Sequence, residues 1–145
     1  MQMNISIQIT HWGEAKSQVM PIRHEIFIKE QKVPEELEWD EFDQGALHAI
    51  IKKDDEVIGA ARLIIDNTIA RIGRMAIKKE FRGQGIGQEM LEALVTKSLE
   101  LDVSLIKLHA QVHAVSFYAK LGFVAHGEIF SEAGIDHVNM QKVLQ

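Results

Sequence analysis

Apolar and polar residues alternate over the first ten positions, and this pattern predicts a β-strand from Asn4 to Thr10. From Glu14 to about Lys29 the apolar residues recur at the spacing of one helix face, which predicts a helix. Pro21 lies inside this segment, and we expect it to split or kink the helix because proline lacks the N–H group that an unbroken helix needs. An acidic stretch from Glu35 to Asp43 follows.

The rest of the chain predicts three strands, a long helix, a strand, a short helix and two closing strands. The expected bounds are about Leu47–Lys52, Val57–Ile65 and Ala70–Ile77 for the three strands, Gln84–Glu100 for the long helix, Leu105–Ala110 for the next strand, Ala114–Leu121 for the short helix, and Phe123–Ile129 and His137–Val143 for the closing strands. Gly122 is a natural stop for the short helix. This order predicts an α/β fold with a mixed sheet, in a single domain that spans residues 1–145.

The long helix has the clearest pattern in the chain. Six apolar residues form one stripe along it, and we expect this stripe to face the core. They are Ile86, Met90, Leu91, Leu94, Val95 and Leu99.

Composition narrows the class of protein. The chain has 145 residues, of which 46% are hydrophobic and 26% charged, and this balance is typical of a globular domain. There is no cysteine, which excludes disulfides, thiolate metal sites and a cysteine nucleophile. The net charge of −5 disfavours nucleic acid as a partner. The sequence has neither a signal-peptide block nor an apolar run of the roughly 18 residues that a membrane helix needs, so we expect a cytoplasmic protein.

A glycine-rich segment, residues 82–87, lies between a predicted strand and the long helix. Glycines let backbone N–H groups approach a ligand closely, and a helix start carries a partial positive charge, so the segment suits a phosphate group. A plain glycine-rich turn is the alternative. A dinucleotide-binding fingerprint is excluded because it would need glycine or alanine where the chain has Gln88. A P-loop is excluded because it would need Gly-Lys-Ser/Thr where the chain has Gln88-Glu89-Met90.

Two motifs identify a family resemblance. Arg82, Gly85 and Gly87 form R-x-x-G-x-G, and Ala114 to Phe123 read A-x-x-F-Y-x-K-x-G-F. Together they resemble the GNAT family of acetyl-CoA-dependent N-acetyltransferases, over nearly the whole chain. Ile28–Pro34 and Glu132–His137 further resemble the ElaA-like branch of that family. The resemblance implies a mostly antiparallel central sheet flanked by helices, and acetyl transfer from acetyl-CoA directly to a primary amine.

The resemblance also implies roles for single residues. The glycine segment would hold the pyrophosphate of CoA through backbone amides, and the preceding strand would bind the pantetheine arm. Gln111 stands where many family members have asparagine. Tyr118, the only tyrosine, would protonate the departing CoA thiolate as general acid. The cofactor-binding residues expected on this basis are Met75, Ala76, Ile77, Arg82, Gly83, Gln84, Gly85, Ile86, Gly87, Gln111 and Phe117.

The general base is missing from its usual place. Many family members have a glutamate on the strand before the glycine segment, but this chain has Arg71, Gly73 and Arg74 there. Arginine is not a base at ordinary pH. The candidates elsewhere for the base or for acceptor binding are Glu30, Glu38, Asp40, Asp43, His48, Arg74 and His137. The acidic stretch favours a cationic acceptor if it lines the pocket, or is a solvated face, while Arg71 and Arg74 suit an anionic acceptor.

The expected co-substrate is acetyl-CoA, and the expected acceptor is a small-molecule or peptide amine. We expect no metal, because His109 and His113 straddle a strand–helix junction without a third ligand. A homodimer is implied by the resemblance alone. A second hypothesis is a CoA-binding sensor or interaction module with reduced catalysis. The missing strand carboxylate favours that hypothesis, and the retained Tyr118 argues against it.

Overall fold

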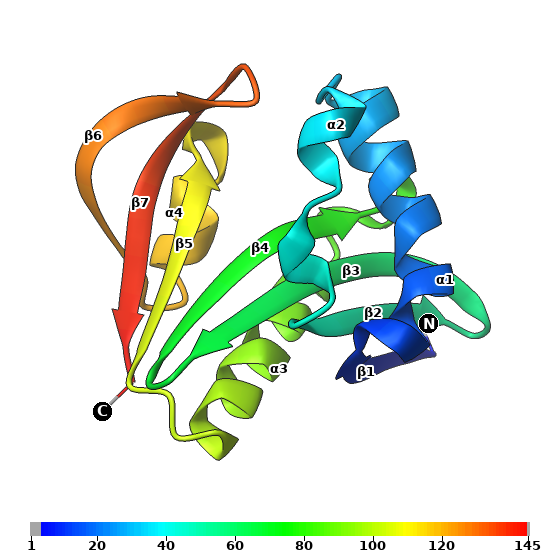
Figure 1. Cartoon of the computed structure of the whole chain (residues 1–145), viewed down its shortest axis with the longest axis horizontal. Coiled ribbons are helices and arrows are strands. Elements are labelled where there is room, and N and C mark those ends of the chain that lie inside the picture. The colour runs from blue at the N-terminus through cyan, green and yellow to red at the C-terminus, as the bar shows by residue number, and fades with distance from the viewer. Residues whose placement is uncertain (1–3, 145) are drawn as a thin grey trace.

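A computed structural model describes residues 4–144, so the first three residues and the last residue of the expected domain lie outside the described residues. A seven-stranded sheet runs through the molecule in the order β1-β2-β3-β4-β5-β7-β6 (Figure 1). The strands are β1 Ile5–His11, β2 Leu47–Lys53, β3 Glu56–Asp66, β4 Ile69–Ile77, β5 Leu105–Gln111, β6 Val124–Glu132 and β7 Ile135–Val143. Every neighbouring pair is antiparallel except β4 and β5, which are parallel. The predicted mixed sheet and order of elements are confirmed.

Helices cover both faces of the sheet. The α-helices are α1 Trp12–Arg23, α2 Glu35–Glu38, α3 Ile86–Glu100 and α4 Val115–Ala119, with short 3₁₀ turns at Glu41–Asp43, Lys79–Phe81 and Val112–Ala114. In Figure 1, α1 and α2 lie over one face of β2 to β4, while α3 lies on the opposite face. Among these helices, none in residues 4–144 is long and apolar enough to cross a membrane.

Of the two effects expected of Pro21, a split of the first helix does not occur, because α1 runs through this residue to Arg23. The helix continues past Arg23 as a π-helix, η1, from His24 to Glu30. Proline lacks only its own N–H donor, and the N–H of His24 still bonds to the carbonyls of Met20 and Pro21. The continued helix brings Glu30 to Arg82 of the glycine segment, and the next residue, Gln31, contacts Gln111 of β5.

Two apolar cores hold the layers together. The larger core packs α3 against the sheet through Ile86, Met90, Leu91 and Leu94, all fully buried. The smaller core packs α1 and η1 against the other face. The predicted stripe of α3 is right except at its end, where Leu99 is 43% exposed. Ser98 is buried there instead, because its hydroxyl donates to the carbonyl of Leu94 and needs no water.

The sheet opens at its centre. Pairing between β4 and β5 ends at Ile72 and Leu108, after which the two strands diverge (Figure 1). A β-bulge in β4 lies just beyond this point: the register passes from Arg62 opposite Gly73 to Ala60 opposite Ala76, so one residue of β3 faces Arg74 and Met75. Bulges bend the strand that contains them, and this one accompanies the divergence of β4 from β5. From Gly73 to Ile77, β4 therefore has no strand partner on its β5 side within the described residues, although the carbonyl of Ile77 accepts from the Arg82 guanidinium at 2.8 Å.

Candidate active site

A cavity of about 1700 Å³ lies where β4 and β5 diverge. Both diverging strands, the glycine segment, η1, α4 and β7 contribute to its walls. Most of the residues expected from the sequence meet in this one cavity. Those that line it are Glu30, Glu38, Asp40, Arg74, Met75, Ala76, Ile77, Arg82, Gly83, Gly85, Gly87, Gln111, Phe117, Tyr118 and His137. The expected residues that do not line it are Asp43, His48, Gln84 and Ile86.

The glycine segment forms a ring of backbone donors at the start of α3. Gly83 and Gly85 have φ angles of 75° and 83°, in the left-handed region that favours glycine. Within residues 4–144, the N–H groups of residues 83 to 88 are not paired with any protein acceptor. Unpaired N–H groups at a helix start make an anion-binding site. Ile86 anchors the loop by packing into the core, and the Gln84 side chain donates to the carbonyl of Glu80.

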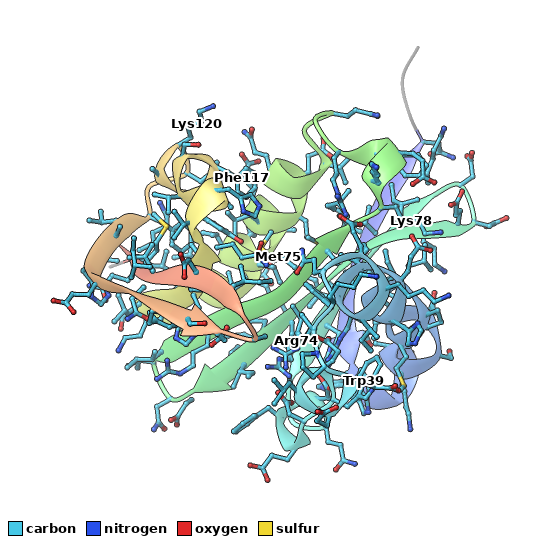
Figure 2. All side chains as sticks on the ribbon, turned by 90° about the horizontal axis from the view of Figure 1, so that it is seen from above. Trp39, Arg74, Met75, Lys78, Phe117 and Lys120 are labelled. Carbon is cyan, nitrogen blue, oxygen red and sulfur yellow. The ribbon has the colours of Figure 1, made fainter. Side chains whose placement is uncertain are left out.

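Tyr118 of α4 contacts the open part of β4 at Met75. Its hydroxyl donates to the sulfur of Met75 at 3.4 Å, and its ring packs edge-to-face on Phe117 and Phe123. In Figure 2, Met75 lies between Phe117 and Arg74. Tyr118 lines the cavity, and its burial raises its pKa to about 12. The hydroxyl is therefore a proton donor at neutral pH.

The end of η1 reaches across the cofactor side of the cavity through two consecutive residues. Glu30 accepts two hydrogen bonds from the Arg82 guanidinium, at 2.7 and 2.8 Å. This bonding lowers the pKa of Glu30 and raises that of Arg82. The side-chain amide of Gln111 donates to Gln31 at 3.1 Å. Both contacts join the end of η1 to residues that were expected from the sequence to bind CoA, Arg82 and Gln111.

A network of buried ion pairs, called here the arginine–carboxylate cluster, forms the opposite end of the cavity wall. Its members are Arg23, Glu38, Asp40, Asp43, Arg62 and Arg74. Arg23 is 1% exposed and bonds both Glu38, at 2.7 Å, and Asp43, at 2.8 Å. Three carboxylates of the acidic stretch thus neutralise three arginines, while Glu35, Glu36 and Glu41 are exposed. Glu38 and Asp40 line the cavity, as one of the two interpretations of this stretch expected, but both are paired with arginines.

Burial and charge act in opposite directions on this cluster. Burial raises the pKa of Glu38 and outweighs the neighbouring guanidinium groups. Burial would also raise the pKa of Asp43, but the hydrogen bonds and charges of Arg23 and Arg62 hold it below its usual value. The pKa of Arg74 is lowered by its burial. Arg74 also has a φ of 52°, an uncommon conformation outside glycine, at the bulge of β4. Its guanidinium bonds to the carbonyl of Glu38 and to Asp40, which fix it there.

His48 lies beneath this cluster rather than in the cavity. Its Nε2 is 2.9 Å from the carbonyl oxygen of Asp43, and its ring packs against Trp12. A carbonyl only accepts, so Nε2 donates. Burial lowers the pKa of His48, which keeps the imidazole neutral at neutral pH. We therefore leave His48 out of the candidate site.

A second group of polar side chains, called here the histidine cluster, lines the cavity on the other side of the opening. It consists of His109 on β5, Glu132 on β6 and His137 on β7. Nδ1 of His109 is 2.9 Å from one Glu132 oxygen, and Nε2 of His137 is 3.7 Å from the other. The ring of Phe130 contacts both imidazoles. In residues 4–144, no group of three or more His, Asp or Glu side chains is arranged to hold a metal ion.

Sequence analysis missed His109 and Glu132 as site residues. The signal that could have found them is the pairing of the closing strands, because β7 sets His109 opposite Asn139 and β6 sets Glu132 opposite Ile135. Glu132 also lies within the segment that resembles the ElaA-like branch.

Comparisons with known proteins agree with this geometry. A family model described as an acetyltransferase (GNAT) domain matches residues 13–144. The chain is 34% identical over 122 residues to YjcF of Bacillus subtilis, described as an uncharacterized N-acetyltransferase, and the match covers 83% of this chain and 87% of YjcF. It is 27% identical over 129 residues to Escherichia coli ElaA, covering 86% of this chain and 84% of ElaA.

Solved structures give the same result. The crystal structure of E. coli ElaA superposes with a TM-score of 0.86, at 24% identity, and covers 95% of this chain and 99% of ElaA. The crystal structure of an acyl-CoA N-acyltransferase from Pseudomonas aeruginosa also has a TM-score of 0.86, at 26% identity, and covers 96% of this chain and 99% of that protein.

Proposed function

Because the chain belongs to the GNAT acetyltransferase family, we propose that it transfers the acetyl group of acetyl-CoA to a primary amine by direct attack. The observation that carries this proposal is the meeting of two features in one cavity: the unpaired N–H groups of residues 83 to 88 and the hydroxyl of Tyr118. A phosphate site alone is compatible with a sensor of CoA. A proton donor beside the open strand adds chemistry that a sensor does not need.

The fit of the cavity to acetyl-CoA follows from its walls. The glycine segment offers N–H groups to the pyrophosphate. The open edge of β4, from Gly73 to Ala76, offers backbone groups without a strand partner to the amides of the pantetheine arm, which would bind as a ligand strand. Two present contacts, Glu30 with Arg82 and Gln31 with Gln111, cross the same side of the cavity. We expect bound CoA to compete with both.

The chain's own residues supply two steps of the reaction. Backbone N–H groups of β4 at the bulge would polarise the thioester carbonyl as the amine attacks. The C–N bond forms, the C–S bond breaks, and the thiolate takes a proton from Tyr118. The cytoplasmic location, the homodimer and the small-molecule or peptide acceptor expected from the sequence remain predictions.

The experiment that tests the proposal measures release of CoA thiol from acetyl-CoA, over a panel of small amines and peptides. Amine-dependent release above the acetyl-CoA hydrolysis background supports the proposal and identifies the acceptor class. CoA binding without amine-dependent release of thiol would favour a CoA-binding sensor.

A further inference from the structure

The tautomer of His137 is fixed by its backbone. Nδ1 of His137 lies 2.7 Å from the carbonyl oxygen of Ile135, two residues earlier on β7. A carbonyl oxygen only accepts hydrogen bonds, so Nδ1 carries the proton. The neutral imidazole therefore keeps its lone pair on Nε2.

The lone pair on Nε2 of His137 lies beside a carboxylate oxygen of Glu132, and both of these atoms are hydrogen-bond acceptors. Nε2 lies 3.7 Å from an oxygen of Glu132, a separation too long for a hydrogen bond, and the His137 side chain is only 8% exposed. Within residues 4–144, Nε2 is not paired with any protein donor. A basic nitrogen and a carboxylate side by side are a site for a group with several N–H donors and a positive charge. A primary ammonium group has both.

The other candidate bases are engaged elsewhere. Glu38, Asp40 and Asp43 are bonded to arginines of the arginine–carboxylate cluster. Glu30 is paired with Arg82. His137, in contrast, is opposite Gln111 in the β5–β7 register, so it lies at the end of β5 that borders the open edge of β4.

We propose that His137 is the general base of the acetyl transfer and that Glu132 binds the ammonium group of the acceptor. The inference rests on the proposed function. The acceptor ammonium gives one proton to Nε2, and the freed electron pair forms the C–N bond while the C–S bond breaks. The second nitrogen proton leaves as the amide forms and restores the Tyr118 hydroxyl, which has given its own proton to the thiolate. The His137 proton then leaves to solvent, and Glu132 stabilises the imidazolium in the meantime.

The main variant is His137→Asn, compared with wild type using an amine that the wild-type chain acetylates. Asparagine places an amide N–H near the position of Nδ1, so it can still donate to the carbonyl of Ile135, but it has no basic nitrogen. The matched control is His126→Asn, because His126 also lines the cavity, on the neighbouring strand β6. Thermal melts and CoA titration accompany the kinetics. We expect His137→Asn to lower kcat by about 10² to 10⁴-fold while the Kd for CoA changes less than about twofold, and His126→Asn to retain wild-type kcat.

Two further variants keep the test decisive. Glu132→Gln keeps an oxygen for His109 but loses the charge, so we expect KM for the amine to rise, with a smaller fall in kcat. His137→Ala leaves space for a small base, and added imidazole should restore part of its kcat. This variant decides the matter if His137→Asn does not fold.

The outcomes separate the inference from the function on which it rests. A wild-type chain that releases no thiol with any amine would overturn the proposed function and the inference together. An active wild type with at least half of its kcat retained in a folded His137→Asn variant would overturn the inference alone. Loss of kcat in His126→Asn with His137→Asn unaffected would do the same.

Discussion

The arginine–carboxylate cluster and the histidine cluster both contribute residues to the wall of the same cavity, yet they differ in how many partners each charged or basic group has. In the first, every carboxylate is bonded to at least one guanidinium group, and Glu38 and Asp43 are 2% and 3% exposed. In the second, Glu132 has one oxygen on His109 and its other oxygen beside the unpaired Nε2 of His137. Charged groups that are paired with one another stabilise the fold, whereas an unpaired basic nitrogen remains available to take a proton from a ligand.

The largest expected effect is a loss of stability when the arginine–carboxylate cluster is disrupted. Arg23→Met removes a buried cation and leaves Glu38 and Asp43 each short of a partner, so we expect a loss of about 3–5 kcal/mol in the free energy of unfolding. The matched control is Arg71→Met, because Arg71 is exposed and is not in any ion pair within the described residues. It should change stability by less than about 0.5 kcal/mol. Urea denaturation measures both. Equal losses in the two variants would show that the buried ion pairs of Arg23 do not hold the fold.

The variant Tyr118→Phe tests the proposed proton donor of the reaction. It removes the hydroxyl, leaves the ring packing, and forfeits only a weak bond to the Met75 sulfur. We expect kcat to fall by about 10² to 10⁴-fold, nearer the lower value because a thiolate is a fairly good leaving group. CoA affinity and stability should change little. A variant that retains more than about half of wild-type kcat, with chemistry rate-limiting, would exclude Tyr118 as the acid.

Substitutions at Gly85 separate backbone shape from charge in the glycine segment. The φ of Gly85 is 83°, and the space beside its Cα is open within 4 Å. Asn and Asp both tolerate this conformation better than other residues, so Gly85→Asn and Gly85→Asp carry a similar strain. CoA at about 100 times Kd should stabilise the wild type by roughly 2.7 kcal/mol. Gly85→Asp should lose this stabilisation because its carboxylate faces the phosphates, while Gly85→Asn should keep part of it. Thermal melts with and without CoA measure the difference, and equal shifts in the two variants would argue against a phosphate at this loop.

The smallest expected effect is the pH dependence of stability that comes from His48, which lies beneath the arginine–carboxylate cluster. The folded chain holds the pKa of His48 below its ordinary value of about 6.5 because the ring is buried. The unfolded chain therefore binds more protons just below that pH, so this contribution to stability is present above about pH 6.5 and is lost as pH falls through the folded pKa. His48→Gln keeps a donor to the carbonyl of Asp43 and does not titrate. Its melting temperature should fall less than that of the wild type between pH 7 and pH 5.5. An identical fall in both would assign the acid sensitivity to other groups.

The meeting of the glycine segment with Phe117 and Tyr118 was implied by the family resemblance, because each of its two motifs lies within a short segment of the sequence. Glycines at positive φ, a helix start and an F-Y pair lie within short segments, and the structure brings Gly85, Phe117 and Tyr118 to one cavity. The acceptor side was not predictable in the same way. Whether Glu38 is free or paired depends on Arg23 and Arg74, which come from either side of it in the chain. The histidine cluster likewise depends on the register of three strands, and no local pattern in the sequence records it.

The central claim is that this cavity moves an acetyl group from acetyl-CoA to an amine. The most direct test is mass spectrometry of the amine after incubation with the chain and acetyl-CoA labelled in its acetyl group. We predict one labelled acetyl group on the amine nitrogen for each CoA thiol released, with the product lost in Gly85→Asp and strongly reduced in Tyr118→Phe. Labelled free acetate in place of the acetylated amine, or equal product from the wild type and both variants, would contradict it.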